Sequence, residues 1–262
     1  MIQVIGIKIV PNNKVHIEIN DEPYSFPRSI SAFQAQASIT PEEYALVQKG
    51  NLQNYQADSA IYQADLAISM KQMLGGFNHD NTNREALKNG FKVPTPSIFL
   101  PHYYHANEAL ARTGVLYDAS GNIIEKKRLK EYLHVLNYKC WVRLNGMFPK
   151  EQESGTGFLG LDLAVITGFD SEDKPLFSRD PLENCLEDNC WADLESLNSQ
   201  GFPTKKSKIK EYIPGKVIRF WYPREDSSAE FYAGSLRAIL GCSRDSQYLI
   251  SSFGAFLCSE EA

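Results

Sequence analysis

The stretch "FYAGSLRAILGCSRDSQYLISSFG", residues 231–254, combines a regular frame with irregular filling. Small, apolar or basic residues recur at steps of two or three, and the positions between them differ widely in character. A step of two places alternate side chains of a strand on opposite faces of a sheet. The stretch therefore predicts strands with a fixed face toward the core and an opposite face that tolerates substitution.

The filling positions also share a property of their codons. Each holds a residue that an AAC or AAT asparagine codon reaches by changes at its adenines alone. Lys, Glu, Met and Trp, which such codons cannot reach, are absent from residues 231–258. Gln247 is not reachable in this way, so we exclude it from the set. The filling positions are Tyr232, Gly234, Leu236, Ile239, Gly241, Ser243, Asp245, Tyr248, Ile250 and Ser252.

The order of the frame residues, with "RFWYPRE" at residues 219–225, resembles the variable region of proteins diversified by diversity-generating retroelements. In that family, adenine-directed mutagenesis during reverse transcription rewrites chosen Asn codons and leaves the intervening codons unchanged. The resemblance is close over about the last forty residues, and the first 95 residues take no part in it. It implies a C-type-lectin-like fold, of the branch related to formylglycine-generating enzymes, and a hypervariable receptor-binding or attachment surface on a virus, a phage tail or a cell.

The resemblance further implies which side chains contact a ligand and which side chains support the fold. The filling positions would contact a protein or glycan ligand, with Tyr232 and Tyr248 as rigid contact area and Ser243, Ser252 and Asp245 as adaptable polar groups. The apolar frame residues and Phe253 would pack, and Arg237 and Arg244 would act as hydrogen-bonding struts. The frame residues assigned to the scaffold are Phe231, Ala233, Arg237, Ala238, Leu240, Cys242, Arg244 and Gly254. The alternative is an ordinary β-rich tail with Ile239 and Ile250 in the core.

The rest of the chain predicts an α+β protein. Its 262 residues, 43% hydrophobic and 23% charged, suit a folded chain with a substantial core. We expect residues 1–95 to form a hairpin plus helices, as an accessory or oligomerisation segment. Residues 96–262 would form the ligand-binding domain, with its variable region at about 229–256. The boundary is placed at the proline-bearing stretch "KVPTPSIFLPHYYH".

Periodicity places the individual elements. Alternation predicts a first hairpin within residues 4–20, and three- and four-residue apolar steps predict helices between Thr40 and Met73. A turn at 119–122 precedes an amphipathic helix at 125–136. Apolar β-rich runs at 139–148, 160–170 and 216–223 predict strands, separated by long loops.

Charge and length exclude some partners. A net charge of −5 and a pI near 5.6 argue against nucleic acid, and the basic run at 203–212 is expected to be a solvated loop. No apolar run has the roughly 20 residues that span a bilayer, so no membrane insertion is expected. No signal peptide is recognised, which favours a tail-associated virion location or a cytoplasmic one.

Few residues suggest catalysis or metal binding. His102 and His105 share a helical face but lack a third ligand, and "DSEDKP" at 170–175 fits a hairpin turn better than a calcium loop. No hydrolase, phosphate-loop or dinucleotide motif is present, so we expect no enzyme, no cofactor and no metal.

The cysteines leave two alternatives open. Five are present, and we expect mostly reduced, buried thiols, with Cys242 and Cys258 as the first choice for any bridge. The same pair would serve a formylglycine-generating-enzyme-like oxidase, which shares the fold. The other alternative is a structural or assembly protein that oligomerises through its amino-terminal part.

Overall fold

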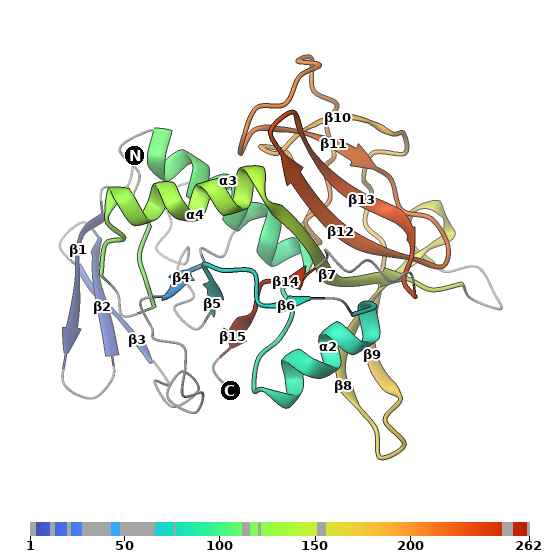
Figure 1. Cartoon of the computed structure of the whole chain (residues 1–262), viewed down its shortest axis with the longest axis horizontal. Helices are drawn as coiled ribbons and strands as arrows, with labels where there is room; N and C mark the ends of the chain where they lie inside the picture. Colours follow the sequence, from blue (N-terminus) through green and yellow to red (C-terminus); the bar gives the residue numbers. More distant parts are fainter. Residues whose placement is uncertain are drawn as a thin grey trace.

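The computed structural model describes residues 4–10, 14–19, 22–27, 43–47, 66–75, 77–111, 116–119, 122–150, 156–247 and 254–260. Helices and mostly antiparallel strands occupy separate parts of the chain, so the protein is α+β, as the sequence predicts (Figure 1). The strands form one large sheet and two small ones.

The large sheet has nine strands and runs in the order β10-β11-β13-β12-β7-β14-β6, with β8 pairing with β7 and β9. Strands β12 and β13 form an antiparallel hairpin at its centre, and β13 also pairs in parallel with β11. The strands are β6 (Leu74–Gly75), β7 (Cys140–Phe148), β8 (Asp162–Phe169), β9 (Pro175–Pro181), β10 (Cys190–Asp193), β11 (Val217–Trp221), β12 (Ser227–Gly234), β13 (Arg237–Asp245) and β14 (Gly254–Ala255). The β-rich runs predicted at 139–148, 160–170 and 216–223 are therefore confirmed as β7, β8 and β11.

The two small sheets have three strands each. Strands β1 (Val4–Val10) and β2 (Lys14–Ile19) form the predicted hairpin, which β3 (Glu22–Pro27) extends. The other small sheet runs in the order β15-β5-β4. Its strands are β4 (Tyr44–Leu46), β5 (Leu66–Ser69) and β15 (Cys258–Glu260).

The prediction of helices between Thr40 and Met73 is wrong for the parts of this region that the structure describes. Residues 44–46 and 66–69 are strands. Residues 48–65 lie outside the described residues. Strand β5 is central in its sheet and buried, with Ala67 and Ile68 at most 3% exposed. A short apolar run has the same periodicity in a buried strand and in a buried helix, and pairing with β15, distant in sequence, decides between them.

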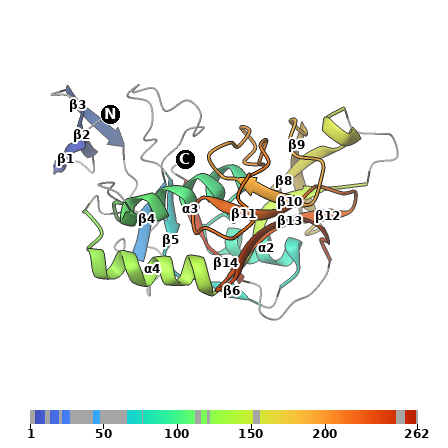
Figure 2. The same ribbon diagram turned by 90° about the horizontal axis from the view of Figure 1, so that it is seen from above.

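Three helices complete the described part of the fold: α2 (His79–Lys88), α3 (Pro96–Ala111) and α4 (Lys126–Tyr138). The helix expected at 125–136 is confirmed as α4, and the backbone pairing of Asp118 with Asn122 matches the turn expected before it. Helices α3 and α4 contact each other beside the sheet (Figure 2).

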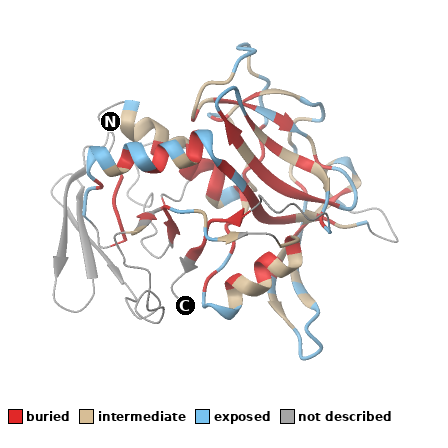
Figure 3. Ribbon diagram, viewed as in Figure 1, coloured by how far each residue is buried: buried red, intermediate tan, exposed pale blue. Residues whose placement is uncertain are grey.

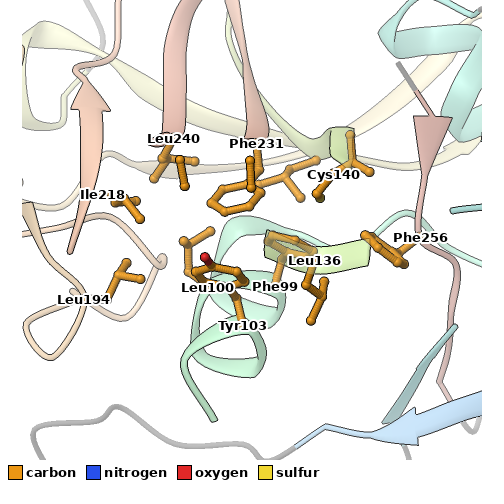
Figure 4. Close-up of a cluster of buried hydrophobic side chains, with 14 of the residues drawn as sticks. Phe99, Leu100, Tyr103, Leu136, Cys140, Leu194, Ile218, Phe231, Leu240 and Phe256 are labelled. Atoms are coloured by element: carbon orange, nitrogen blue, oxygen red, sulfur yellow. The ribbon is translucent and has the colours of Figure 1, made fainter. Parts of the chain in front are cut away.

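The main core lies between the helices and the inner face of the large sheet (Figures 3 and 4). The Phe231 ring lies 5.0 Å from that of Phe99 and 4.8 Å from that of Tyr103, both on α3. Phe256, between β14 and β15, lies 5.7 Å from Phe99. This core also includes Ile68, so it contains residues from both sides of the boundary expected near residue 95.

Two loops have the structures that the sequence predicts. The basic run at 203–212 lies between β10 and β11, with Lys205 and Lys206 exposed to solvent. The "DSEDKP" segment closes the β8–β9 hairpin, where the Asp170 carboxylate accepts the backbone N–H groups of Glu172 and Lys174. The long connection between β9 and β11 carries its own packing, since Leu194, Leu197 and Phe202 are buried.

Candidate functional site

In the central hairpin, β13 alternates between buried and more exposed residues, whereas in β12 every residue except Tyr232 is buried. Phe231, Ala233, Ala238, Leu240 and Cys242 are fully buried. The positions between them hold partly exposed side chains, except Gly234 and Glu230. This alternation is the pattern that the frame predicts, and it gives the large sheet an inner and an outer face.

The register of the strands extends the alternation into rows across the sheet. One inner row runs Val142, Phe231, Leu240 and Phe220, each 0% exposed. One outer row, here called the tyrosine row, runs Trp141, Tyr232, Ile239, Arg219 and Trp191. A second outer row, the glutamate row, runs Arg143, Glu230, Gly241 and Trp221. Five strands contribute to the tyrosine row and four to the glutamate row, and the two rows lie on the same face of the sheet.

A hollow of about 150 Å³ opens on this outer face, which we call the aromatic hollow. Its lining residues are Trp141, Trp221, Glu230, Tyr232, Arg237, Ile239, Gly241, Ser243 and Arg244. The rings of Trp141 and Tyr232 meet at 88° with centroids 4.5 Å apart, which makes a perpendicular aromatic corner. At Gly241 a Cβ atom would have no neighbour within 4 Å, so the strand backbone there is open to an approaching group.

All three tryptophans of the chain lie in the two outer rows. Trp141 and Trp221 are each 36% exposed, a large fraction for a ring that a sheet protein normally covers. Arg219 lies over the Trp191 ring at 4.9 Å. The outer face is thus aromatic and basic at once.

A buried ionic group lies beneath the hollow. Arg143 Nη1 donates to Glu230 Oε1 at 2.8 Å, and its Nε donates to the carbonyl of Phe77 at 3.0 Å. Arg244 Nε lies 3.5 Å from the other Glu230 oxygen. Burial raises the pKa of the Glu230 carboxyl, and the charges of Arg143 and Arg244 act against that rise.

Two expected positions differ from the simple alternation. Gly234 was expected to face outward, but it is buried, and a Cβ atom there would lie 2.5 Å from the Tyr232 hydroxyl. Arg237 was expected to be a scaffold strut, yet it is exposed and lies over the Tyr232 ring at 5.7 Å. Both flank the two-residue turn after β12, where strand alternation ends. Leu236 in this turn is 84% exposed.

The end of the stretch is described in part. Ser243 is partly exposed, and Asp245 is exposed and accepts the backbone N–H of Gln247. Tyr248, Ile250 and Ser252, with Phe253, lie outside the described residues. Gly254 is buried in β14, where a Cβ atom would lie 2.3 Å from the carbonyl oxygen of Leu74.

Gln247, which the codon criterion excludes from the variable set, has a structural role. The Asn78 side-chain amide donates to its Oε1 at 2.9 Å, and its own Nε2 lies 3.3 Å from Asp80. These contacts join the end of the stretch to the start of α2.

Sequence reasoning missed the residues that other strands contribute, above all Trp141, Trp221 and Glu230. A signal was present, because Trp141 and Arg143 alternate with Val142 as Tyr232 and Glu230 alternate with Phe231. Only the register of the four strands β7, β12, β13 and β11 brings these side chains together.

The other candidates show different roles. His102 is fully buried with its Nε2 2.7 Å from the Tyr132 hydroxyl, and burial lowers the pKa of His102 to about 3 and that of His105 to about 4. Among the described residues, no cluster of three potential ligands could hold a metal ion.

All five cysteines are free, in agreement with the expected reduced thiols. Cys242 and Cys258 are buried, and burial raises the pKa of Cys242 well above its usual value. Of the helices in the described ranges, none combines the length and apolar character needed to cross a membrane.

No family model matches this chain, and comparison with curated proteins and with solved structures finds no match either.

Proposed function

We propose that this chain is a non-enzymatic binding protein whose combining site is the outer face of the large sheet, centred on the aromatic hollow. The observation that carries this proposal is the convergence of Tyr232, Ile239, Gly241 and Ser243 on that hollow. The frame selects these positions from the sequence without reference to the fold, and each of them holds a residue that an Asn codon reaches by changes at its adenines.

The physical character of the face supports binding. Exposed aromatic rings and arginines are the side chains that most often dominate binding energy at interfaces. Exposed substitutions typically change stability by no more than about 0.5 kcal/mol, so the outer rows can vary while the inner row keeps the fold. Retroelement diversification on a C-type-lectin-like scaffold is the proposed source of that variation, and it rests on the sequence resemblance.

The oxidase alternative receives no support from the cysteines. A thiolate is the reactive form of cysteine, and reactive thiols are partly exposed and have lowered pKa values. Cys242 has the opposite environment, since it is 0% exposed and its pKa is raised by burial. Replacing Cys242 and Cys258 with Ala, which keeps these buried positions apolar, is expected to leave ligand binding unchanged in the molecules that fold.

A pair of display libraries tests the proposal. One library randomises outward positions with adenine-substituted Asn codons: Tyr232, Leu236, Ile239, Gly241, Ser243 and Asp245. The matched control randomises inward positions in the same way: Phe231, Ala233, Ala238, Leu240 and Cys242. Outward members should mostly resist protease and yield binders to a chosen protein target, whereas inward members should mostly unfold.

Equal loss of protease resistance in the two libraries would contradict the proposal, as would an outward library that folds but yields no binder. The flanking DNA gives an independent check on the retroelement origin. A reverse transcriptase and a template repeat that differs from this stretch at adenines are expected there.

A further inference from the structure

We infer that the ligand group bound in the aromatic hollow is an acidic saccharide residue, a sugar ring bearing a carboxylate. This inference rests on the proposed function and adds the chemical class of the ligand. It comes from the shape, the aromatic walls and the charge of the hollow, taken in turn.

The size of the hollow indicates a ring-sized group. Pockets for drug-sized ligands span about 300–1,000 Å³, whereas this one measures about 150 Å³. It therefore holds one residue of a larger ligand, with the rest lying along the outer rows. Gly241 is among the lining residues, and a Cβ atom there would meet nothing within 4 Å, so a ring can approach the backbone closely.

The walls alone fit two kinds of ligand. Trp141, Tyr232 and Trp221 line the hollow, with Arg237 over the Tyr232 ring. Aromatic rings attract either an organic cation or the apolar C–H face of a sugar ring. A cage of aromatic rings with one glutamate is typical of sites for quaternary ammonium groups.

The charge of the hollow decides between them. Arg237 and Arg244 line it together with a single carboxylate, Glu230, and Arg143 lies directly behind that carboxylate. Arg143 and Arg244 both contact the Glu230 carboxylate, so its charge is matched by arginine, and the exposed Arg237 adds a positive charge that repels a cation and attracts an anion. Guanidinium groups pair with carboxylates through directed, charge-assisted hydrogen bonds.

The strand pairing favours a saccharide over an extended peptide. Peptides often bind to sheets by adding a strand at an open edge. The hollow lies over β12 and β13, which are paired on both sides, so its recognition depends on side chains. Aromatic faces for ring C–H groups, arginines for a carboxylate and Ser243 for hydroxyls together match an acidic sugar.

A division of roles follows from the frame. Trp141, Trp221, Arg237 and Arg244 are outside the set of variable positions, whereas Tyr232, Ile239, Gly241 and Ser243 belong to it. The constant residues therefore fix the ligand class, and the variable ones select among members of that class.

Titration of the full chain by tryptophan fluorescence tests this inference, because all three tryptophans lie in the outer rows. The probes are two matched pairs: 3′-sialyllactose with lactose, and tetragalacturonate with its methyl ester. The acidic member of at least one pair should bind about tenfold tighter or more than its neutral partner, as expected for a charge-assisted contact. Its affinity should fall with added salt.

Variants locate the contact. Arg237→Gln should abolish most of the preference for the acidic probe, and because Arg237 is exposed the variant should fold normally. Gly241→Trp should block both members of a pair. The matched control is Arg179→Gln, an exposed arginine on β9, which should bind as the unmodified chain does.

Choline chloride and a blocked acidic peptide, acetyl-Gly-Glu-Gly-Glu-Gly-amide, complete the set of probes. Tighter binding of choline, binding of the peptide alone, or equal binding within both pairs would overturn the acidic-saccharide inference and leave the proposed function standing. Failure of every probe to bind would overturn it too, and the display libraries would then test the proposed function separately.

Discussion

At the scale of single residues, the two glycines of the central hairpin play opposite parts. Gly241 faces an open hollow, whereas Gly234 lies directly under the Tyr232 hydroxyl. The codon criterion places both among the variable positions and cannot tell them apart. The difference arises because a tyrosine two residues away folds back over Gly234, a contact that no strand period encodes.

This contact predicts that positions 232 and 234 do not vary independently. Gly234→Ala should cost about 1–3 kcal/mol of unfolding free energy while Tyr232 is present, because the new methyl group displaces the ring. In a Tyr232→Ser background the same change should cost less than about 0.5 kcal/mol. Urea unfolding of the four chains of this double-mutant cycle measures the coupling.

Gly241→Ala provides the control for this cycle, since no atom lies within 4 Å of its new methyl group and its effect should be small in both backgrounds. Additive costs at 232 and 234 would show that the two positions are uncoupled.

At the scale of elements, the hairpin β12–β13 separates stability from surface chemistry. Phe231→Ala should lower the unfolding free energy by about 3–5 kcal/mol, because it leaves a cavity between the sheet and α3. Ile239→Ala, on the opposite face of the next strand, should cost less than about 1 kcal/mol. Chemical denaturation measures both, and comparable losses would mean that the outer face also serves as core.

The packing of α3 on α4 predicts a pH dependence of stability. Burial holds the pKa of His102 at about 3, against 6.5 for an exposed histidine, so the folded protein disfavours the charged form. The unfolded chain takes up the proton first, and the unfolding free energy should therefore fall as the pH drops below 6.5. The slope from this one group is at most about 1.4 kcal/mol per pH unit.

His102→Gln should flatten that slope between pH 6.5 and 4.5, while the Gln side chain can still bond the Tyr132 hydroxyl. An unaltered slope in His102→Gln would place the acid sensitivity elsewhere, for example at His105, whose pKa burial lowers to about 4.

At the scale of the whole molecule, residues 254–260 join parts that lie far apart in the sequence. Strand β14 pairs with both β7 and β6, and β15 pairs with β5. Between them Phe256 packs on Phe99 of α3 and on Tyr132 of α4. One short segment thus links the large sheet, a small sheet and two helices.

Phe256→Ala is accordingly predicted to destabilise the whole described core rather than its end alone. We expect a loss of about 3–5 kcal/mol with a single cooperative transition by both circular dichroism and tryptophan fluorescence. Two separate transitions would show that the large sheet unfolds independently of the carboxy-terminal strands.

The same long-range pairing explains what the sequence could and could not predict. Hairpins, turns and the helix α4 follow from local periodicity, and the alternation in residues 231–242 predicts its own inner and outer faces. Local periodicity predicts a helix where β5 lies, because the pairing that makes this segment a strand is with β15, almost two hundred residues away in the chain. The place of Trp141 and Trp221 beside the same hollow as Tyr232 is unpredictable for the same reason, since it depends on the register of four strands.

Under the proposed diversification, the turn that joins β12 to β13 has a further consequence for the range of surfaces that could arise. Gly234 pairs with Arg237 across a link of only two residues, so the hairpin has a set length and its strands are held on both sides. Codon substitution exchanges side chains and leaves chain length untouched. Successive versions of the surface would thus share one backbone and differ only in their side chains. Antibodies, by contrast, also vary the length of their loops. The repertoire should be wide in chemistry and narrow in shape.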